Sequence, residues 1–244
     1  MYAIILAAGK GSRMMSDLPK PLLPVAGKSM LLHVIDAAEP LISTSNMCIV
    51  YGHKGDVMQE HVKKDGLKWV EQSPQLGTGD AVRVATDVVI DDSPALILYG
   101  DVPLIQTKTL EKLKANFESN RAALTVLTAV LDNPAGYGRI VKGTDGKVVG
   151  VVEEKDASVE EKKIKEVNTG IMLVDGGCLR RWVYSLKNEN TQKEYYLTDI
   201  VAMAASENYL VTTEVVACSN EVLGANDVEQ LQELERLYVE RVIA

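Results

Sequence analysis

The sequence predicts an α/β fold: a Rossmann-like, mostly parallel mixed sheet flanked by helices, with a small β-rich lobe. Three observations lead to this prediction. Apolar strand-like runs alternate with amphipathic runs through the first half of the chain. The 244 residues are 46% hydrophobic, which suffices to bury one sizeable core. Beyond about residue 132 the apolar runs become shorter, and turn signals separate them.

The elements of the first half follow from the spacing of apolar residues. Continuous apolar runs predict buried strands at residues 2–6, 47–51, 95–99 and 122–131. Apolar residues at helical spacing predict helices at residues 29–41, about 56–63, 79–89 and about 108–116. Strands and helices in this order are typical of a parallel sheet with helical crossovers.

The second half combines a hairpin with a return to longer elements. The turn signals "NPAGYG" and "TDG" frame two short strands, at residues 139–142 and 148–153. Further strands are expected at residues 165–174 and 210–217, and helices at residues 177–186, 197–206 and 227–244. The last of these helices carries its apolar residues on one face.

Charge and composition exclude several classes of protein. The formal net charge of −8 argues against broad nucleic-acid binding, which needs a basic surface. The sequence contains no run of roughly 18 apolar residues, which a membrane-spanning helix would need. Its apolar start lacks the basic residues that precede the apolar part of a signal peptide. Cys48, Cys178 and Cys218 are far apart and form no C-x-x-C pair, as expected for reduced thiols. We therefore expect a cytoplasmic protein.

A glycine-rich loop, "LAAGKGSRM" at residues 6–14, follows the first strand. Such a turn can present backbone N–H groups to phosphate oxygens, and Lys10, Arg13 and Lys20 add positive charge. The Walker pattern is absent, and Met14 stands where a dinucleotide-binding loop needs its third glycine. The loop therefore predicts a different phosphate site, with an ordinary surface turn and solvated cations as the alternative.

The loop and the segment after it, "LPKPLLPVAGK", resemble the signature of sugar-1-phosphate nucleotidylyltransferases. Six further motifs resemble, in order, the N-terminal half of the bacterial bifunctional N-acetylglucosamine-1-phosphate uridylyltransferase/glucosamine-1-phosphate acetyltransferase family. These motifs are "VYGH", "QLGTGDAV", "LYGDVPL", "GYGRIV", "EVNTGI" and "EYYLTDIV". The resemblance covers essentially the whole chain and implies a fold of the nucleotide-diphospho-sugar transferase type.

The resemblance also implies how the chain is organised. Residues 1–244 would form a single nucleotidyltransferase domain: 1–131 mainly bind nucleotide, 132–225 bind sugar, and 226–244 form the C-terminal helix. The hexapeptide repeats of the family's acetyltransferase β-helix domain do not occur in the sequence. Since that half builds the family's trimer, the oligomeric state stays open.

The implied reaction transfers UMP from UTP to N-acetylglucosamine 1-phosphate and releases pyrophosphate. The attacking phosphate is mostly dianionic near neutrality, with a second pKa of about 6, so it needs no protein base. This agrees with His33, His53 and His61, which form no recognisable catalytic group. Bringing two anions together calls for a divalent cation held by oxygen ligands, and the family uses Mg²⁺.

The resemblance assigns roles to individual residues. Catalytic positions are Arg13 and Lys20, and the metal ligands are Asp101 and Asn226. The positions that match the family's nucleotide site are Leu6, Ala7, Ala8, Gly9, Gln72, Gly77 and Thr78. The positions that match its sugar site are Tyr99, Gly138, Glu153, Asn168 and Thr198.

Two of these residues have simpler explanations. Asp101 follows an expected strand, at the edge where open α/β sheets bind ligands, but an aspartate two residues before proline also favours a turn. Asn226 begins the last expected helix, with Glu229 three residues on, so it could serve as the helix N-cap.

Two departures from the family pattern concern specificity. Leu23 and Asp80 each stand where histidine is customary, beside segments that contact nucleotide. Sugar and base are therefore less certain than the reaction type. Glucose 1-phosphate or N-acetylmuramic acid 1-phosphate remains an alternative acceptor, and a catalytically silent nucleotide-binding subunit is an alternative function.

Overall fold

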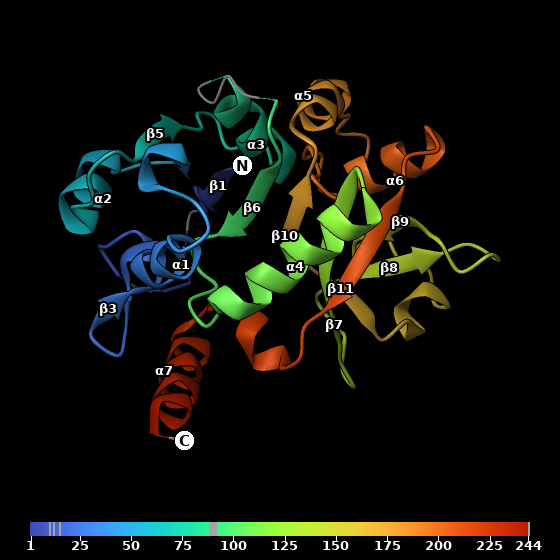
Figure 1. Ribbon diagram of the computed structural model, residues 1–244. Coiled ribbons are helices and arrows are strands. Elements are labelled where there is room, and N and C mark those ends of the chain that lie inside the picture. Colours follow the sequence, from blue (N-terminus) through green and yellow to red (C-terminus); the bar gives the residue numbers. More distant parts are fainter. Residues whose placement is uncertain (10, 12, 15, 88–91, 244) are drawn as a thin grey trace.

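The computed structural model describes the chain except residues 10, 12, 15, 88–91 and 244. Nine strands of the described chain form one sheet at the centre of the molecule (Figure 1). They are β1 Tyr2–Ala7, β4 Met47–Tyr51, β5 Lys68–Glu71, β6 Ala95–Tyr99, β7 Leu124–Val130, β8 Gly138–Lys142, β9 Val148–Val152, β10 Glu166–Val174 and β11 Val211–Val215. A separate short hairpin joins β2 Pro24–Val25 and β3 Lys28–Ser29.

The strand order is β11-β7-β10-β6-β1-β4-β5; in addition, β8 pairs with β10, and β9 pairs with β8. Strands β6, β1, β4 and β5 run parallel, as do β11 and β7, whereas β10 is antiparallel to β6, β7 and β8. The predicted mostly parallel mixed sheet is thus confirmed. Because β10 lies between β6 and β7, residues on both sides of position 131 share this sheet.

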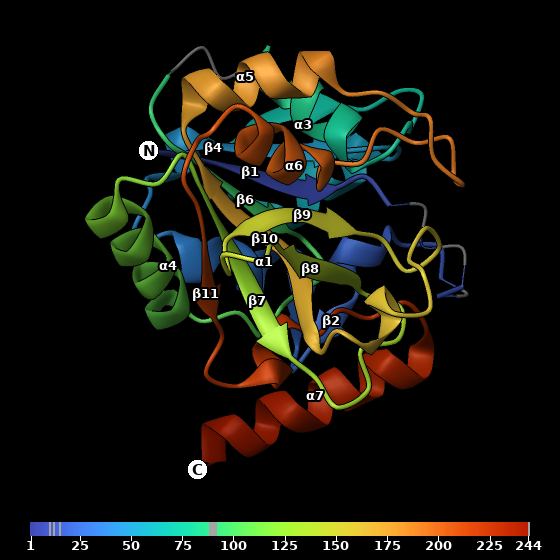
Figure 2. The same cartoon turned by 90° about the vertical axis from the view of Figure 1, so that its right-hand side faces the viewer.

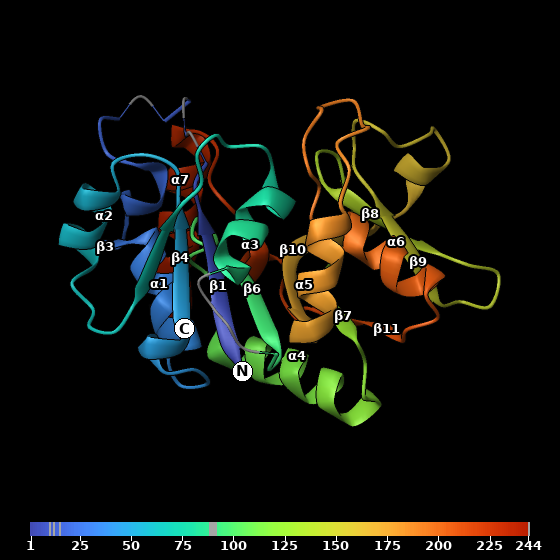
Figure 3. The same cartoon turned by 90° about the horizontal axis from the view of Figure 1, so that it is seen from above.

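Helices cover both faces of the sheet (Figures 2 and 3). The helices of the described chain are α1 Met30–Ala38, α2 Gly55–Val62, α3 Thr78–Thr86, α4 Thr107–Asn120, α5 Gly176–Ser185, α6 Asp199–Ser206 and α7 Val228–Ile243, of which α7 packs beside the sheet. Single 3-10 turns are η1 Lys20–Leu22, η2 Thr44–Asn46, η3 Glu161–Lys163 and η4 Ser219–Val222. In the described chain no helix combines the length and apolar character needed to cross a lipid bilayer.

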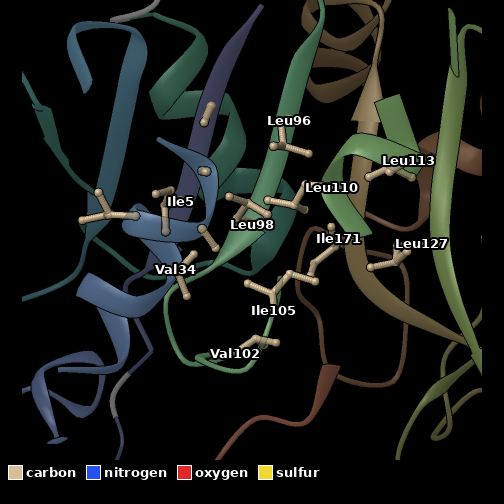
Figure 4. Close-up of a cluster of buried hydrophobic side chains, with 14 of the residues drawn as sticks. Ile5, Val34, Leu96, Leu98, Val102, Ile105, Leu110, Leu113, Leu127 and Ile171 are labelled. Carbon is tan, nitrogen blue, oxygen red and sulfur yellow. The ribbon is translucent and has the colours of Figure 1, made fainter. Parts of the chain in front are cut away.

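The alternating side chains of β1 divide the core into two layers, because successive residues of a strand point to opposite faces. Ile5 belongs to the cluster under α1, α2 and α4, which Figure 4 shows with Val34 and Leu110. Ile4 belongs to the cluster under α3, α5 and α6, which includes Trp182. Because β1 is buried on both faces, its sequence is continuously apolar.

A third, smaller core joins helix α7 to the segment around Lys20. Leu234 of α7 is fully buried among Leu23, Val25 and Met30. Helix α7 also holds the β2–β3 turn, since the backbone N–H of Ala26 donates to a carboxylate oxygen of α7 at 3.1 Å. Leu23, one of the two departures from the family pattern, is therefore a core residue in this structure.

Several elements differ from the sequence-based expectations. Strand β5 was not expected from the sequence. It lies at the end of the sheet, pairs only with β4 among the described strands and is half-buried, so its apolar pattern is weak. Helix α1 begins one residue later than expected, with Ser29 as its N-cap, and ends at Ala38. Helix α4 continues to Asn120, four residues beyond the expected end. The expected end of α3, at Val88 and Val89, lies outside the described residues.

Candidate active site

A cavity of about 410 Å³ opens at the carboxyl ends of β1 and β6, where ligands bind in open α/β sheets. Every residue predicted to bind nucleotide lines it: Leu6, Ala7, Ala8, Gly9, Gln72, Gly77 and Thr78. Lys20, Tyr99 and Asp101 line it as well. Residues expected to act together thus share one cavity.

The glycine-rich loop packs closely against the segment that carries Lys20. Gly11 has a φ of +56°, and a Cβ atom there would lie 2.7 Å from the Cβ of Lys20. The loop closes with a hydrogen bond from the backbone N–H of Met14 to the carbonyl oxygen of Gly11, 3.0 Å long. Arg13, in this turn, is exposed and is not among the described residues that line the cavity. Lys10 lies outside the described residues.

Lys20 brings the two predicted metal ligands together. Its Nζ lies 2.5 Å from Oδ2 of Asp101 and donates to Oδ1 of Asn226 at 3.1 Å. Asp101 follows β6, and Asn226 precedes α7. The side chain of Lys20 is 10% exposed, so this contact is more shielded from water than a surface ion pair. The three residues form one charged cluster at the edge of the cavity.

The expectation that Asn226 begins the last helix is wrong. Helix α7 begins at Val228, and Oδ1 of Asp227 accepts from the backbone N–H of Gln230 at 2.9 Å, as an N-cap does. The backbone N–H of Asn226 donates instead to the side chain of Gln230, at 2.7 Å. This shift of one residue leaves the side-chain oxygen of Asn226 available to the cluster with Lys20.

The donor set at this cluster fits a small hard cation. A carboxylate oxygen and an amide oxygen already share one cationic group, the Lys20 ammonium. No group of three or more His, Cys, Asp and Glu side chains able to hold a metal occurs in the described chain. Such a two-residue arrangement suits Mg²⁺, which usually binds through one or two protein oxygens together with substrate phosphates and waters.

The loop that begins α3 forms part of the cavity wall. This loop is joined to residues 195–197 by three hydrogen bonds: Tyr195 N–H to Leu76 O at 2.8 Å, Gly79 N–H to Tyr195 O at 2.8 Å, and Leu197 N–H to Thr78 Oγ1 at 3.1 Å. Gln72 lies beneath the loop and donates from Nε2 to the Gly77 carbonyl oxygen at 2.9 Å. The loop is thus fixed from two sides.

Replacing Gly77 by alanine is expected to weaken nucleotide binding in this cavity by about tenfold or more, because such backbone strain costs about 1–3 kcal/mol. Gly77 has a φ of +112°, and a Cβ would lie 2.7 Å from the carbonyl oxygen of Tyr195. Isothermal titration calorimetry measures the effect. Gly146→Ala is the control, since that glycine also has a positive φ but faces open space. Wild-type affinity in Gly77→Ala would contradict the expected clash.

The predicted sugar residues lie next to one another beside the cavity. Thr198 Oγ1 donates to Glu153 Oε1 at 2.8 Å, and Gly138 is the strand partner of Asn168. Asn168 Oδ1 accepts from the backbone N–H of Gly170 at 3.0 Å, where a Cβ would clash with the ring of Tyr99. The cluster therefore links Tyr99 to the β8–β9 hairpin.

Burial sets the electrostatics of the sugar-side cluster. It raises the pKa of the Glu153 carboxyl above its usual range, against the opposing effect of the Thr198 hydrogen bond. Burial also raises the pKa of Tyr99, and the carboxylates of Glu153 and Asp101 add to the effect. Glu153 lines a separate cavity of about 300 Å³. Polar groups of this kind can bind sugar hydroxyls without taking part in proton transfer.

Sequence reasoning missed several residues that line the main cavity: Pro21, Gln75, Ala81 and Glu194. Gln75 matters most, because its Nε2 donates to the carbonyl oxygen of Ala8 at 2.7 Å and so fixes the end of β1. Its place as the first residue of the motif "QLGTGDAV", directly before an expected helix, was the available signal.

Comparisons with known proteins identify relatives of this chain. Residues 3–142 match the family model of the MobA-like NTP transferase domain. The bifunctional protein GlmU of Azoarcus sp. (strain BH72) is 51% identical over 238 residues, which are 98% of this chain and 52% of that protein. The chain thus spans about half the length of this relative.

Solved structures show the same fold. A UDP-glucose pyrophosphorylase complexed with UDP-glucose superposes with a TM-score of 0.77 at 15% identity, and 98% of each chain is covered. An apo UDP-glucose pyrophosphorylase gives a TM-score of 0.75 at 14% identity, with 99% of each chain covered. The predicted fold type is therefore confirmed.

Proposed function

Because this chain belongs to the MobA-like NTP transferase family, we propose that it is a sugar-1-phosphate uridylyltransferase. It transfers UMP from UTP to N-acetylglucosamine 1-phosphate and forms UDP-N-acetylglucosamine and pyrophosphate. The cluster of Lys20, Asp101 and Asn226 at the edge of the cavity is the observation that carries the proposal. The ordered sequence motifs support the choice of base and sugar.

The reaction needs charge neutralisation and alignment more than proton transfer. A phosphate oxygen of the sugar phosphate attacks the α-phosphorus of UTP in line, and the bond from that phosphorus to the pyrophosphate oxygen breaks. The N–H groups of the glycine-rich loop and the ammonium of Lys20 bind the triphosphate. Arg13, an exposed residue of the same loop, would help Lys20 to neutralise the triphosphate.

Mg²⁺ is the proposed metal, and Asp101 and Asn226 would hold it together with substrate oxygens. When bound there, the ion supplies the charge that brings the two anionic substrates together. Gln72, Gly77 and Thr78 would hold the base. On the sugar side, Glu153 and Asn168 would bind hydroxyl and N-acetyl groups, with Tyr99, Gly138 and Thr198 shaping the same surface.

Pyrophosphate release across a substrate panel tests the proposal. UTP, dTTP, CTP, ATP and GTP are each combined with the 1-phosphates of N-acetylglucosamine, glucose and N-acetylmuramic acid, in the presence of Mg²⁺. We expect UTP with N-acetylglucosamine 1-phosphate to give the highest kcat/KM. Preference for glucose 1-phosphate or N-acetylmuramic acid 1-phosphate would refute the proposed sugar. Nucleotide binding without turnover of any pair would indicate a catalytically silent subunit.

A further inference from the structure

The side-chain amide of Gln72 is held in one orientation. Gln72 is 3% exposed and lines the main cavity. Its Nε2 donates to the Gly77 carbonyl oxygen at 2.9 Å and to Oδ2 of Asp80 at 2.8 Å. Both partners accept hydrogen bonds, and an amide nitrogen has two N–H donors, so both donors are used within the protein. The group left for a ligand is the acceptor oxygen, Oε1.

Asp80 is itself fixed on both carboxylate oxygens. It is 4% exposed, in the first turn of α3, where the helix dipole favours negative charge. Its Oδ1 pairs with the guanidinium of Arg83, and Oδ2 accepts from Gln72. Arg83 in turn lies over the ring of Tyr195, 5.2 Å from the ring centroid. A buried carboxylate held in this way is a rigid acceptor.

We propose that Asp80 is a specificity-determining positioning residue for the base. It keeps Oε1 of Gln72 directed at the cavity, so a bound base must present an N–H group at that point. The N3–H of uracil meets this requirement, whereas N3 of cytosine is itself an acceptor and would be repelled. The inference rests on the proposed function, since it assumes that the cavity holds the base of UTP.

The energetic reason is the cost of an unmatched polar group. Two acceptors facing each other in a buried site lose a hydrogen bond and cannot regain it from water. A site built to hydrogen-bond one ligand therefore rejects the mismatched analogue more strongly than shape complementarity does. Without the Asp80 acceptor, the Gln72 amide keeps only its contact with Gly77 and can turn more easily.

Equilibrium binding of UTP and CTP, in the presence of Mg²⁺, tests the role of Asp80 without requiring turnover. We expect wild-type protein to prefer UTP, and Asp80→Asn to lower the preference about tenfold, because the asparagine amide can donate to Oε1 of a turned Gln72. Arg83→Gln is the matched control: it removes the positive charge, but the Asp80 acceptor stays and the glutamine amide can still donate to it, so the preference should change less than about twofold. Thermal melting verifies that each variant is folded.

A double-mutant cycle shows whether Asp80 acts through Gln72. In a Gln72→Ala background, Asp80→Asn should cause no further loss of preference, because coupled residues are not additive. Additive losses would overturn the positioning role. A second probe needs only wild-type protein: N3-methyl-UTP, which lacks the N–H group, should bind at least about tenfold more weakly than UTP. Equal binding of the two nucleotides would overturn the orientation of Oε1.

The same data separate this inference from the proposed function. If wild-type protein selects UTP and Asp80→Asn keeps that selection, only the role of Asp80 is refuted. If wild-type protein binds CTP as tightly as UTP, the proposed base and the role of Asp80 are both refuted.

Discussion

Replacing Asp101 by asparagine is expected to lower kcat by about a thousandfold, because a metal that neutralises transition-state charge contributes several kcal/mol. Asparagine keeps the shape of the side chain and one oxygen ligand, but it removes the negative charge that Lys20 contacts at 2.5 Å. Initial rates of pyrophosphate release at saturating substrates measure the effect. The affinity for Mn²⁺ in the presence of UTP, followed by electron paramagnetic resonance, should fall in the same variant.

Asp132→Asn is the matched control for this substitution. Asp132 is a fully exposed carboxylate that pairs with Lys165 at 2.9 Å, so losing its charge should leave both kcat and metal affinity unchanged. Exposed ion pairs of this kind contribute little. The melting temperature of Asp101→Asn should also stay close to wild type, since the Asp101 side chain is partly exposed. Wild-type turnover in Asp101→Asn would remove this residue from the metal site.

Local patterns predicted the parts of the fold that are buried on both sides. Strands β1, β4 and β6 are continuously apolar, and their carboxyl ends mark the edge at which Asp101 lies. Strand β5 is half-buried at the end of the sheet, so its sequence carries no clear period. The N-cap of α7 was misplaced by one residue, since both Asn226 and Asp227 favour that position.

The contacts within the site could not be predicted from local patterns. Lys20 and Asn226 are 206 residues apart, and only tertiary packing brings their side chains together. The two residues that replace a customary histidine show the same limit of sequence-based prediction. Local sequence offers no reason to treat Leu23 and Asp80 differently. In the structure Leu23 packs in the core beneath α7, whereas Asp80 contacts Gln72 at the cavity. Whether each residue lies in the core or at the cavity depends on which element packs against it, and local sequence does not show this.

Replacing Lys20 by methionine is expected to have two opposite effects. The kcat should fall about a hundredfold, as expected when one preorganised charge at a transition state is removed. In the absence of nucleotide, the affinity for Mn²⁺ should instead rise by about tenfold, which corresponds to about 1.4 kcal/mol of binding free energy. The reason is that the Lys20 ammonium contacts the same two oxygens that would hold the metal, on Asp101 and Asn226.

Methionine retains an unbranched apolar stem, so packing against Gly11 should persist while the charge is lost. Electron paramagnetic resonance of Mn²⁺ with the nucleotide-free protein measures the gain, and pyrophosphate release measures the loss. Lys165→Met is the control and should change neither quantity. If Lys20→Met binds Mn²⁺ no better than wild type, the ammonium does not compete with a cation for these oxygens. If the affinity rises while kcat falls, Lys20 must leave Asp101 when substrate arrives, and the triphosphate is the anion that can draw it away.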